Sequence, residues 1–220
     1  MNTVTLIGIT NPVLPGAQTV EDFIAYVARV SNPGNQANTA TNGKLLAYLM
    51  KHQHWSPFEM VHVVMEVNTT RDIARQILRH RSFSFQEFSQ RYALATELGF
   101  ETREARLQDP KNRQASIKTT DHELEDLWQE KQQELLGAVR KTYDWAISNG
   151  IAKEQARAVL PEGNTHSRLY MAGSLRSWIH YCLLRVEAGT QLEHRRVAQE
   201  ALDIIKAQFP SIAELLQPKE

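Results

Sequence analysis

Residues 121–148 constrain the fold most, because their pattern is that of one long amphipathic helix. Apolar side chains recur there at helical spacing, and an acidic opening turn suits the positive end of a helix. The pair Asn149-Gly150 then stops the helix. We expect its apolar face to point into the core, with these side chains inward: Leu124, Leu127, Trp128, Leu135, Val139 and Trp145.

Short β-prone runs predict a small, mostly antiparallel sheet. Residues 4–9 form a short apolar run, and residues 61–67 alternate between a face of large apolar side chains and a mixed face. Two further short strands are expected within residues 92–108. The polar residues 109–120 are expected to form a loop.

The other periodic segments predict helices that are separated by proline, glycine and asparagine breakers. Thr69 or Thr70 is expected to cap one of them. With no internal repeat or interdomain linker, residues 1–220 are expected to form a single domain. Its class is α+β, helix-rich, with a small sheet and long C-terminal helices. The expected helices cover residues 20–30, 45–50, 71–80, 156–160, 168–188 and 191–209.

Composition excludes several classes of protein. The 25 basic and 25 acidic residues balance, which argues against a nucleic-acid partner that needs a broad positive surface. No apolar run approaches the roughly 18 residues of a membrane span, and no signal layout opens the chain, so we expect a cytoplasmic protein. Cys182 is the only cysteine, and His52, His54 and His62 lack the spacing of a zinc site, so no metal is predicted. Residues 194–196 are interpreted as basic helix surface.

Positive charge is concentrated in residues 71–91, where five arginines stand against Asp72 and Glu87, a local formal charge of 5 − 2 = +3. Guanidinium groups beside serine hydroxyls are the chemistry of a phosphate or carboxylate binder. A solvated basic helix face is the alternative. Gln76 and Arg79 are three residues apart, so one helix face would carry both an amide and a guanidinium.

The end of this segment offers a second set of polar groups. Ser89, Gln90 and Arg91 present a hydroxyl, an amide and a guanidinium in consecutive positions, which suits a phosphate clamp. Glu87 is either a structural ion-pair partner or a carboxylate that faces a ligand. Neither a Gly-x-Gly-x-x-Gly motif nor a phosphate loop occurs, so side chains would have to hold any dinucleotide.

The spacing of these residues resembles the signature of the flavin-dependent thymidylate synthases: Arg79-His80-Arg81, seven residues, then Ser89 and Arg91. Weaker matches in the same order extend the resemblance from about residue 28 to residue 193. They lie at residues 28–31, 54–59, 156–161 and 175–185.

The resemblance implies an FAD-dependent methyltransferase that reductively methylates dUMP to dTMP. It further implies 5,10-methylenetetrahydrofolate as one-carbon donor, NADPH as reductant, and a homotetramer whose active sites are shared between subunits. Arg185 would stabilise N3-deprotonated uracil, and no cysteine would act as nucleophile. The implied dUMP ligands are Gln76, Arg79, Glu87, Ser89, Gln90, Arg91, Arg157 and Arg185. The implied FAD ligands are Ser31, Ser56, Glu59, Arg79, His80, Arg81, Gln86, Glu87, Ser174, Arg176 and His180.

The chain departs from the family pattern at three implied flavin ligands, since Gln86, Ser174 and His180 stand where asparagine is usual. A rival hypothesis from another class is a nucleotide- or RNA-binding module without catalysis, in which Arg79, Arg81 and Arg91 contact phosphates. Bound flavin distinguishes the two, because only the enzyme would be yellow.

Overall fold

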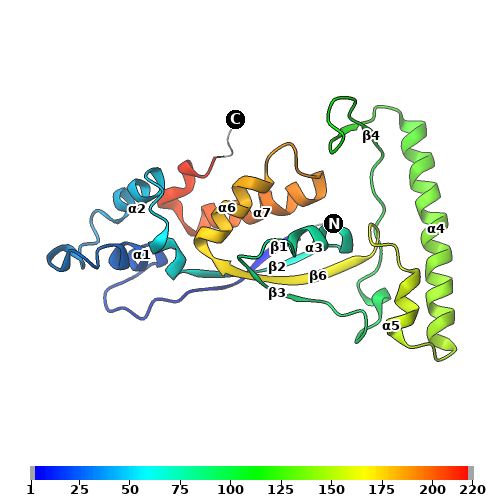
Figure 1. The fold of residues 1–220 in the computed structure, drawn as a ribbon, viewed down its shortest axis with the longest axis horizontal. Helices are drawn as coiled ribbons and strands as arrows, with labels where there is room; N and C mark the ends of the chain where they lie inside the picture. Colours follow the sequence, from blue (N-terminus) through cyan, green and yellow to red (C-terminus); the bar gives the residue numbers. More distant parts are fainter. Residues whose placement is uncertain (1–2, 218–220) are drawn as a thin grey trace.

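The computed structural model describes residues 3–217, drawn as a ribbon in Figure 1. A sheet with strand order β1-β2-β6-β3 forms its centre, and β4 and β5 form a separate hairpin. The helices are α1 (Val20–Ala28), α2 (Asn42–Lys51), α3 (Arg71–Ile77), α4 (His122–Ser148), α5 (Lys153–Ala156), α6 (Leu175–Arg185) and α7 (Leu192–Gln208). The strands are β1 (Thr3–Ile9), β2 (His62–Thr70), β3 (Ser84–Glu87), β4 (Arg106–Gln108), β5 (Ser116–Lys118) and β6 (His166–Ser174). Short 3-10 helices are η1 (Pro33–Asn35), η2 (Ser56–Met60), η3 (Ala95–Glu97), η4 (Arg157–Val159) and η5 (Pro210–Leu215).

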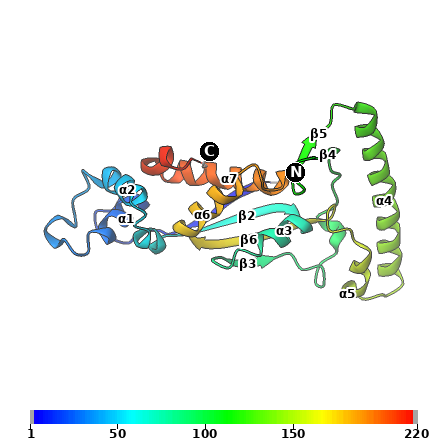
Figure 2. The same ribbon diagram turned by 45° about the horizontal axis from the view of Figure 1, so that its top comes forward.

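The central sheet is antiparallel throughout and is covered on one side. Helices α6 and α7 lie over that side, α1 and α2 lie at one end, and α4 stands at the other (Figures 1 and 2). Alternation explains the burial, since every second side chain of β2 and β6 enters the core under the helices. The uncovered side carries Ile7 and Tyr170, which are 50% and 37% exposed. The predicted α+β class with a small antiparallel sheet is confirmed.

The helix predicted over residues 168–188 is wrong in its first part, which is the central strand β6. That strand pairs with β2 over nine residues, from His62↔Ser174 to Thr70↔His166, and with β3 on its other side. Gly173 shows why a strand fits here. A Cβ atom at this position would lie 2.5 Å from the Phe83 ring, so only glycine lets that ring pack on the strand. Helix α6 begins at Leu175, after Ser174 has capped it through Ser177 N.

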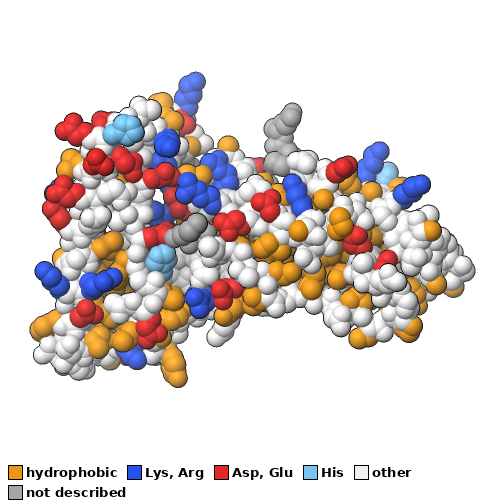
Figure 3. Space-filling model, turned by 180° about the vertical axis from the view of Figure 1, so that it is seen from behind, with side chains coloured by type: hydrophobic (Ala, Val, Ile, Leu, Met, Phe, Trp, Pro, Cys, Tyr) orange, Lys and Arg blue, Asp and Glu red, His pale blue; other side chains and the backbone are white. Residues whose placement is uncertain are grey.

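Helix α4 has the predicted position, but its apolar face does not enter the core. Of the six side chains predicted to point inward, only Val139 is buried, and the other five are 39–62% exposed. The buried positions of α4 instead include Gln132 and Tyr143, which face the segment 95–105. Periodicity reports that a helix has an apolar face, but it does not say which surface covers that face. Figure 3 shows hydrophobic side chains exposed both at the α4 end and over the middle of the molecule.

Four smaller predictions also change. Residues 92–108 hold β4 and the 3-10 helix η3, and the predicted loop 109–120 contains β5, the partner of β4. The helix predicted over residues 71–80 ends at Ile77. Thr70 occupies its N-cap position, but the Thr70 hydroxyl donates to the Asp72 carboxylate and makes no backbone cap. Within residues 3–217, no helix is long and apolar enough to cross a membrane.

Candidate active site

The signature segment lies where α3 gives way to β3. Beyond Ile77 the backbone turns twice, through hydrogen bonds from His80 N to Ile77 O and from Phe83 N to His80 O. Phe83 anchors this turn in the core against Gly173 and Trp178. Arg79 and Arg81 are exposed, and neither side chain makes a hydrogen bond or ion pair with another described residue. The turn therefore displays two free guanidinium groups.

Gln76, His80, Tyr181, Arg185 and His194 form a group that we call the histidine cluster. Arg185 Nε donates to His80 Nε2 at 3.0 Å, and the His80 ring meets Tyr181 edge to face with centroids 4.9 Å apart. The Tyr181 hydroxyl lies 3.1 Å from His194 Nε2, and His194 Nδ1 lies 3.3 Å from Gln76 Oε1. Two of the implied dUMP ligands, Gln76 and Arg185, are thus joined through three aromatic side chains.

Both histidines of this cluster are neutral at physiological pH. Burial, together with the nearby Arg185 and Arg79 charges, lowers the pKa of His80. Burial, Arg185 and His80 lower the pKa of His194 to about 3. A neutral His80 that accepts from Arg185 holds the guanidinium by its Nε edge, so the two terminal nitrogens of Arg185 are the ones available to a ligand.

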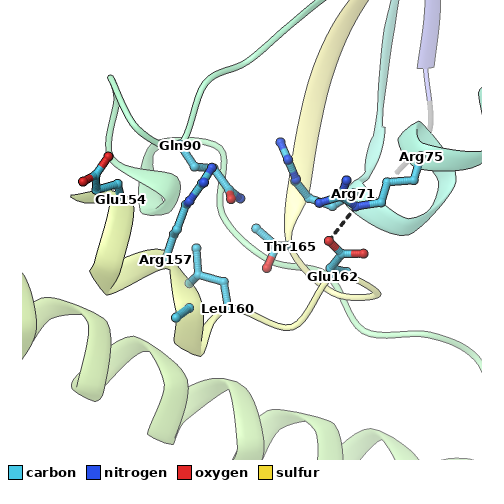
Figure 4. Close-up of a pocket in the computed structure, with 9 residues that line it drawn as sticks. Arg71, Arg75, Gln90, Glu154, Arg157, Leu160, Glu162 and Thr165 are labelled. Atoms are coloured by element: carbon cyan, nitrogen blue, oxygen red, sulfur yellow. Dashed lines mark hydrogen bonds and ion pairs between the residues drawn. The ribbon is translucent and has the colours of Figure 1, made fainter. Parts of the chain in front are cut away.

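A second group of implied ligands lines a cavity of about 400 Å³ between α3 and η4. Arg157 reaches across it towards Gln90, and Arg71 and Arg75 enter from α3 (Figure 4). Arg75 is paired with Glu162 at 2.6 Å, whereas the Arg157 side chain makes no hydrogen bond or ion pair within residues 3–217. A free guanidinium in an arginine-lined cavity suits a phosphate.

The remaining implied nucleotide ligands border this cavity. Arg91 pairs with Glu154 at 3.1 Å, and Ser89 is exposed beside it. Glu87 accepts from Arg71 at 3.0 Å and from the Ser167 hydroxyl at 2.7 Å, so in one chain it fills the structural role considered for it. No hydrogen bond or ion pair among the described residues joins this second group to Gln76, Arg79 or Arg185.

A third group gathers several implied flavin ligands where η2 meets α6. Arg176 donates to Glu59 at 2.7 Å, and hydrogen bonds from Arg176 and Ser174 lower the pKa of Glu59. His180 lies nearby, with its ring 4.6 Å from that of Trp55. The Nε of Arg176 is buried without a hydrogen-bond partner among the described residues, but the side chain as a whole is 44% exposed, so the guanidinium can still meet an anionic ligand. Ser56 is exposed at the start of η2, and Ser31, Arg81 and Gln86 are exposed elsewhere on the chain.

The interpretation of residues 194–196 as basic surface is wrong for His194, whose side chain is completely buried. Its spacing contained the signal, because His194 lies three and four residues before Val197 and Ala198 on the buried stripe of α7. Tyr181 and Gln191 were also missed as site residues, since nothing local separates them from core and loop positions. Cys182 is fully buried, and burial raises the pKa of its thiol, so it is no ready nucleophile.

Comparisons with known proteins identify the family of this chain. Residues 14–211 match the family model described as thymidylate synthase complementing protein. A probable flavin-dependent thymidylate synthase of Paramecium bursaria Chlorella virus 1 is 47% identical, over 96% of this chain and 97% of the relative. A flavin-dependent thymidylate synthase of Synechocystis is 49% identical, over 90% and 89%. A crystal structure of a UMP/dUMP methylase from Streptomyces cacaoi, bound with 5-Br dUMP, superposes with a TM-score of 0.80 at 27% identity, over 97% and 93%.

The chain belongs to the thymidylate synthase complementing protein family. The family predicted from the signature is thereby confirmed. The prediction of an enzyme of the flavin-dependent thymidylate synthase class is confirmed by the same relatives.

Proposed function

We propose that this protein methylates dUMP to dTMP, with FAD as its cofactor and 5,10-methylenetetrahydrofolate and NADPH as co-substrates. The observation that supports it most is the Arg185 guanidinium, held by neutral His80 in the same cluster as the Gln76 amide. The amide suits the uracil edge, and a fixed cation suits the negative charge that develops on the ring when C5 is activated. Residues 1–220 would act as one domain, in the cytoplasm.

The nucleotide ligands of one site would come from two chains. Gln76, Arg79 and Arg185 would bind the base side, and the cavity of Arg157 and Gln90 on a neighbouring chain would bind the phosphate. Glu87, Ser89 and Arg91 border that cavity and would complete it. This division fits the separation of the two groups within a single chain, because neither group alone offers both an edge for the base and a phosphate clamp.

The third group, together with the arginines of the turn after α3, fits an anionic dinucleotide. Arg176 is partly exposed, Arg79 and Arg81 are free cations, and none of these positions needs a glycine-rich turn. Glu59 holds Arg176 in place, and Ser31, Ser56, Gln86, Ser174 and His180 would add polar contacts to the cofactor. FAD in its reduced form supplies the reducing equivalents when it is bound. The chain contributes binding, orientation and a cation beside the uracil, and it needs no thiolate.

Purified protein is expected to be yellow, with the absorbance of oxidised isoalloxazine, and to bleach when NADPH is added. It should form dTMP from dUMP only when methylenetetrahydrofolate is present. Arg81→Ala removes an exposed cation that supports no other described side chain, so it should retain helical circular dichroism and lose most of its flavin absorbance. Colourless wild-type protein that binds RNA would instead support the rival binding module.

A homotetramer is part of the proposal, and the exposed face of α4 supports it. Leu124, Trp128, Leu135 and Trp145 follow one another at helical spacing along that face, and each is 39–62% exposed. A row of large apolar side chains on a soluble enzyme needs a partner surface, and a second copy of the chain supplies one in a symmetric assembly.

Leu135→Glu is expected to break the assembly, because it places a charge in the middle of this apolar row. Light scattering after gel filtration should show a smaller particle, with reduced flavin content. The matched control is Gln133→Glu, which adds the same charge on the same helix about 200° away around its axis. An unchanged particle mass for Leu135→Glu would remove this face of α4 from the interface.

A further inference from the structure

A chain of hydrogen bonds runs through the Gln76 amide and has one direction. The chain starts at Tyr181, whose hydroxyl lies 3.1 Å from His194 Nε2. His194 Nδ1 in turn lies 3.3 Å from Gln76 Oε1. Gln76 Nε2 then donates to Gln191 Oε1 at 2.8 Å, and Gln191 Nε2 donates to Glu193 Oε2 at 3.0 Å. The chain therefore begins on a hydroxyl and ends on a carboxylate.

The carboxylate end sets the direction. Glu193 stays ionised, because hydrogen bonds from Arg106 and the charge of Arg103 outweigh its burial and lower its pKa to about 2. An ionised carboxylate can only accept, so Gln191 must present its NH₂ group to Glu193 and its oxygen to Gln76. Gln76 must then direct an N–H at Gln191. Its amide cannot flip without losing a hydrogen bond at a largely desolvated position.

The opposite end of the chain enforces the same direction. Gln76 Oε1 accepts, so the proton of neutral His194 must lie on Nδ1, which leaves Nε2 as an acceptor. The Tyr181 hydroxyl can donate to that nitrogen, because burial raises its pKa and keeps it protonated. A reversed amide would require the other tautomer of His194, with its proton on Nε2, and the buried Tyr181 hydroxyl would then lose the acceptor for its own proton.

We propose that Gln191, His194 and Tyr181 are positioning residues that lock the amide of Gln76 and thereby make the site select uracil over cytosine. The inference rests on the proposed binding of dUMP at Gln76. The locked amide keeps one free N–H on Nε2, and Arg185, which lies in the same cluster and acts on His194 through its charge, is a donor only. The N–H groups of Gln76 and Arg185 can donate to the C4 carbonyl of uracil. The C4 amino group of cytosine is itself a donor, so it would face these N–H groups without forming a hydrogen bond. An unlocked amide could turn its oxygen to that amino group.

Gln191→Met tests this, because methionine has a similar length but neither accepts from Gln76 strongly nor donates to Glu193. Isothermal titration of dUMP and of dCMP into FAD-loaded protein gives two dissociation constants. The ratio of the dCMP to the dUMP constant is expected to fall about tenfold from its wild-type value, which corresponds to about 1.4 kcal/mol. Tyr181→Phe, which releases the other end of the chain, should lower the ratio in the same direction and keeps the buried ring.

The matched control is Gln199→Met on the exposed side of α7, where the amide bonds only Asp203 among the described residues. It should leave the ratio unchanged. Equal weakening of both nucleotides by Gln191→Met and Tyr181→Phe, with an unchanged ratio, would overturn the inference and leave the proposed function intact. If wild-type protein failed to bind dUMP, the proposed function itself would fail.

Discussion

Arg185→Lys is expected to lower the rate of dTMP formation by at least about 100-fold, the usual loss when one fixed donor to a developing anion is removed. Lysine keeps the positive charge, but it has no planar fork that His80 can hold by one edge while the other nitrogens face the uracil. The charge would therefore remain near the site without a fixed direction.

The measurement is the turnover rate at saturating dUMP, together with the flavin spectrum and the melting temperature. Flavin content and stability should be close to wild type, because the described contact of Arg185 is with His80 and not with the Glu59–Arg176 group. The control is Arg196→Lys, the same substitution at an exposed position of α7 that pairs with Glu104. Near wild-type turnover of Arg185→Lys would remove Arg185 from the catalytic residues.

Co-expression of Arg157→Ala with Arg185→Lys is expected to restore activity that neither variant has alone. If each site takes Arg157 from one chain and Arg185 from another, random association in a symmetric assembly gives about one quarter of the sites both native arginines. The recovered rate per site should approach that fraction of the wild-type rate. Such recovery from two inactive chains has no explanation if each chain builds its own site.

The matched control is co-expression of Arg79→Ala with Arg185→Lys. These two residues belong to the same side of the proposed site and would come from the same chain. Every site in the mixture would then lack one of them, and activity should stay at the level of the single variants. Recovery in this control, or its absence in the Arg157 and Arg185 mixture, would contradict the division of ligands between chains.

Local patterns predicted much of the fold. The lengths of α4 and α7 and the buried face of β2 follow from periodicity, which neighbouring residues carry themselves. The prediction of a helix where β6 lies was wrong for a physical reason. Its apolar residues suit a helix as well as a strand, and the decision came from pairing with β2 and β3, which lie over 80 residues away in sequence. Strand pairing at such distance leaves little trace in the strand itself.

The site residues also fall into those that local sequence predicted and those that only the structure revealed. The signature of residues 79–91 could be recognised from the sequence because its arginines, histidine and serine lie in one continuous segment. The hydrogen bonds that fix the Gln76 amide could not be predicted from the sequence, since His194 and Gln191 lie 118 and 115 residues further along the chain. Only the packing of α7 against α3 brings them together, and burial with the nearby Arg185 charge lowers the pKa of His194 and keeps it neutral.

The amino-acid order therefore sufficed for the family, the chemical class of the ligands and the apolar face of α4, because each depends on residues close in sequence. Folding in three dimensions was needed to show that this face is uncovered in one chain, and that the nucleotide ligands form two separate groups. Both depend on which distant surfaces meet, and that outcome is set by the packing of the whole chain, which local spacing does not encode.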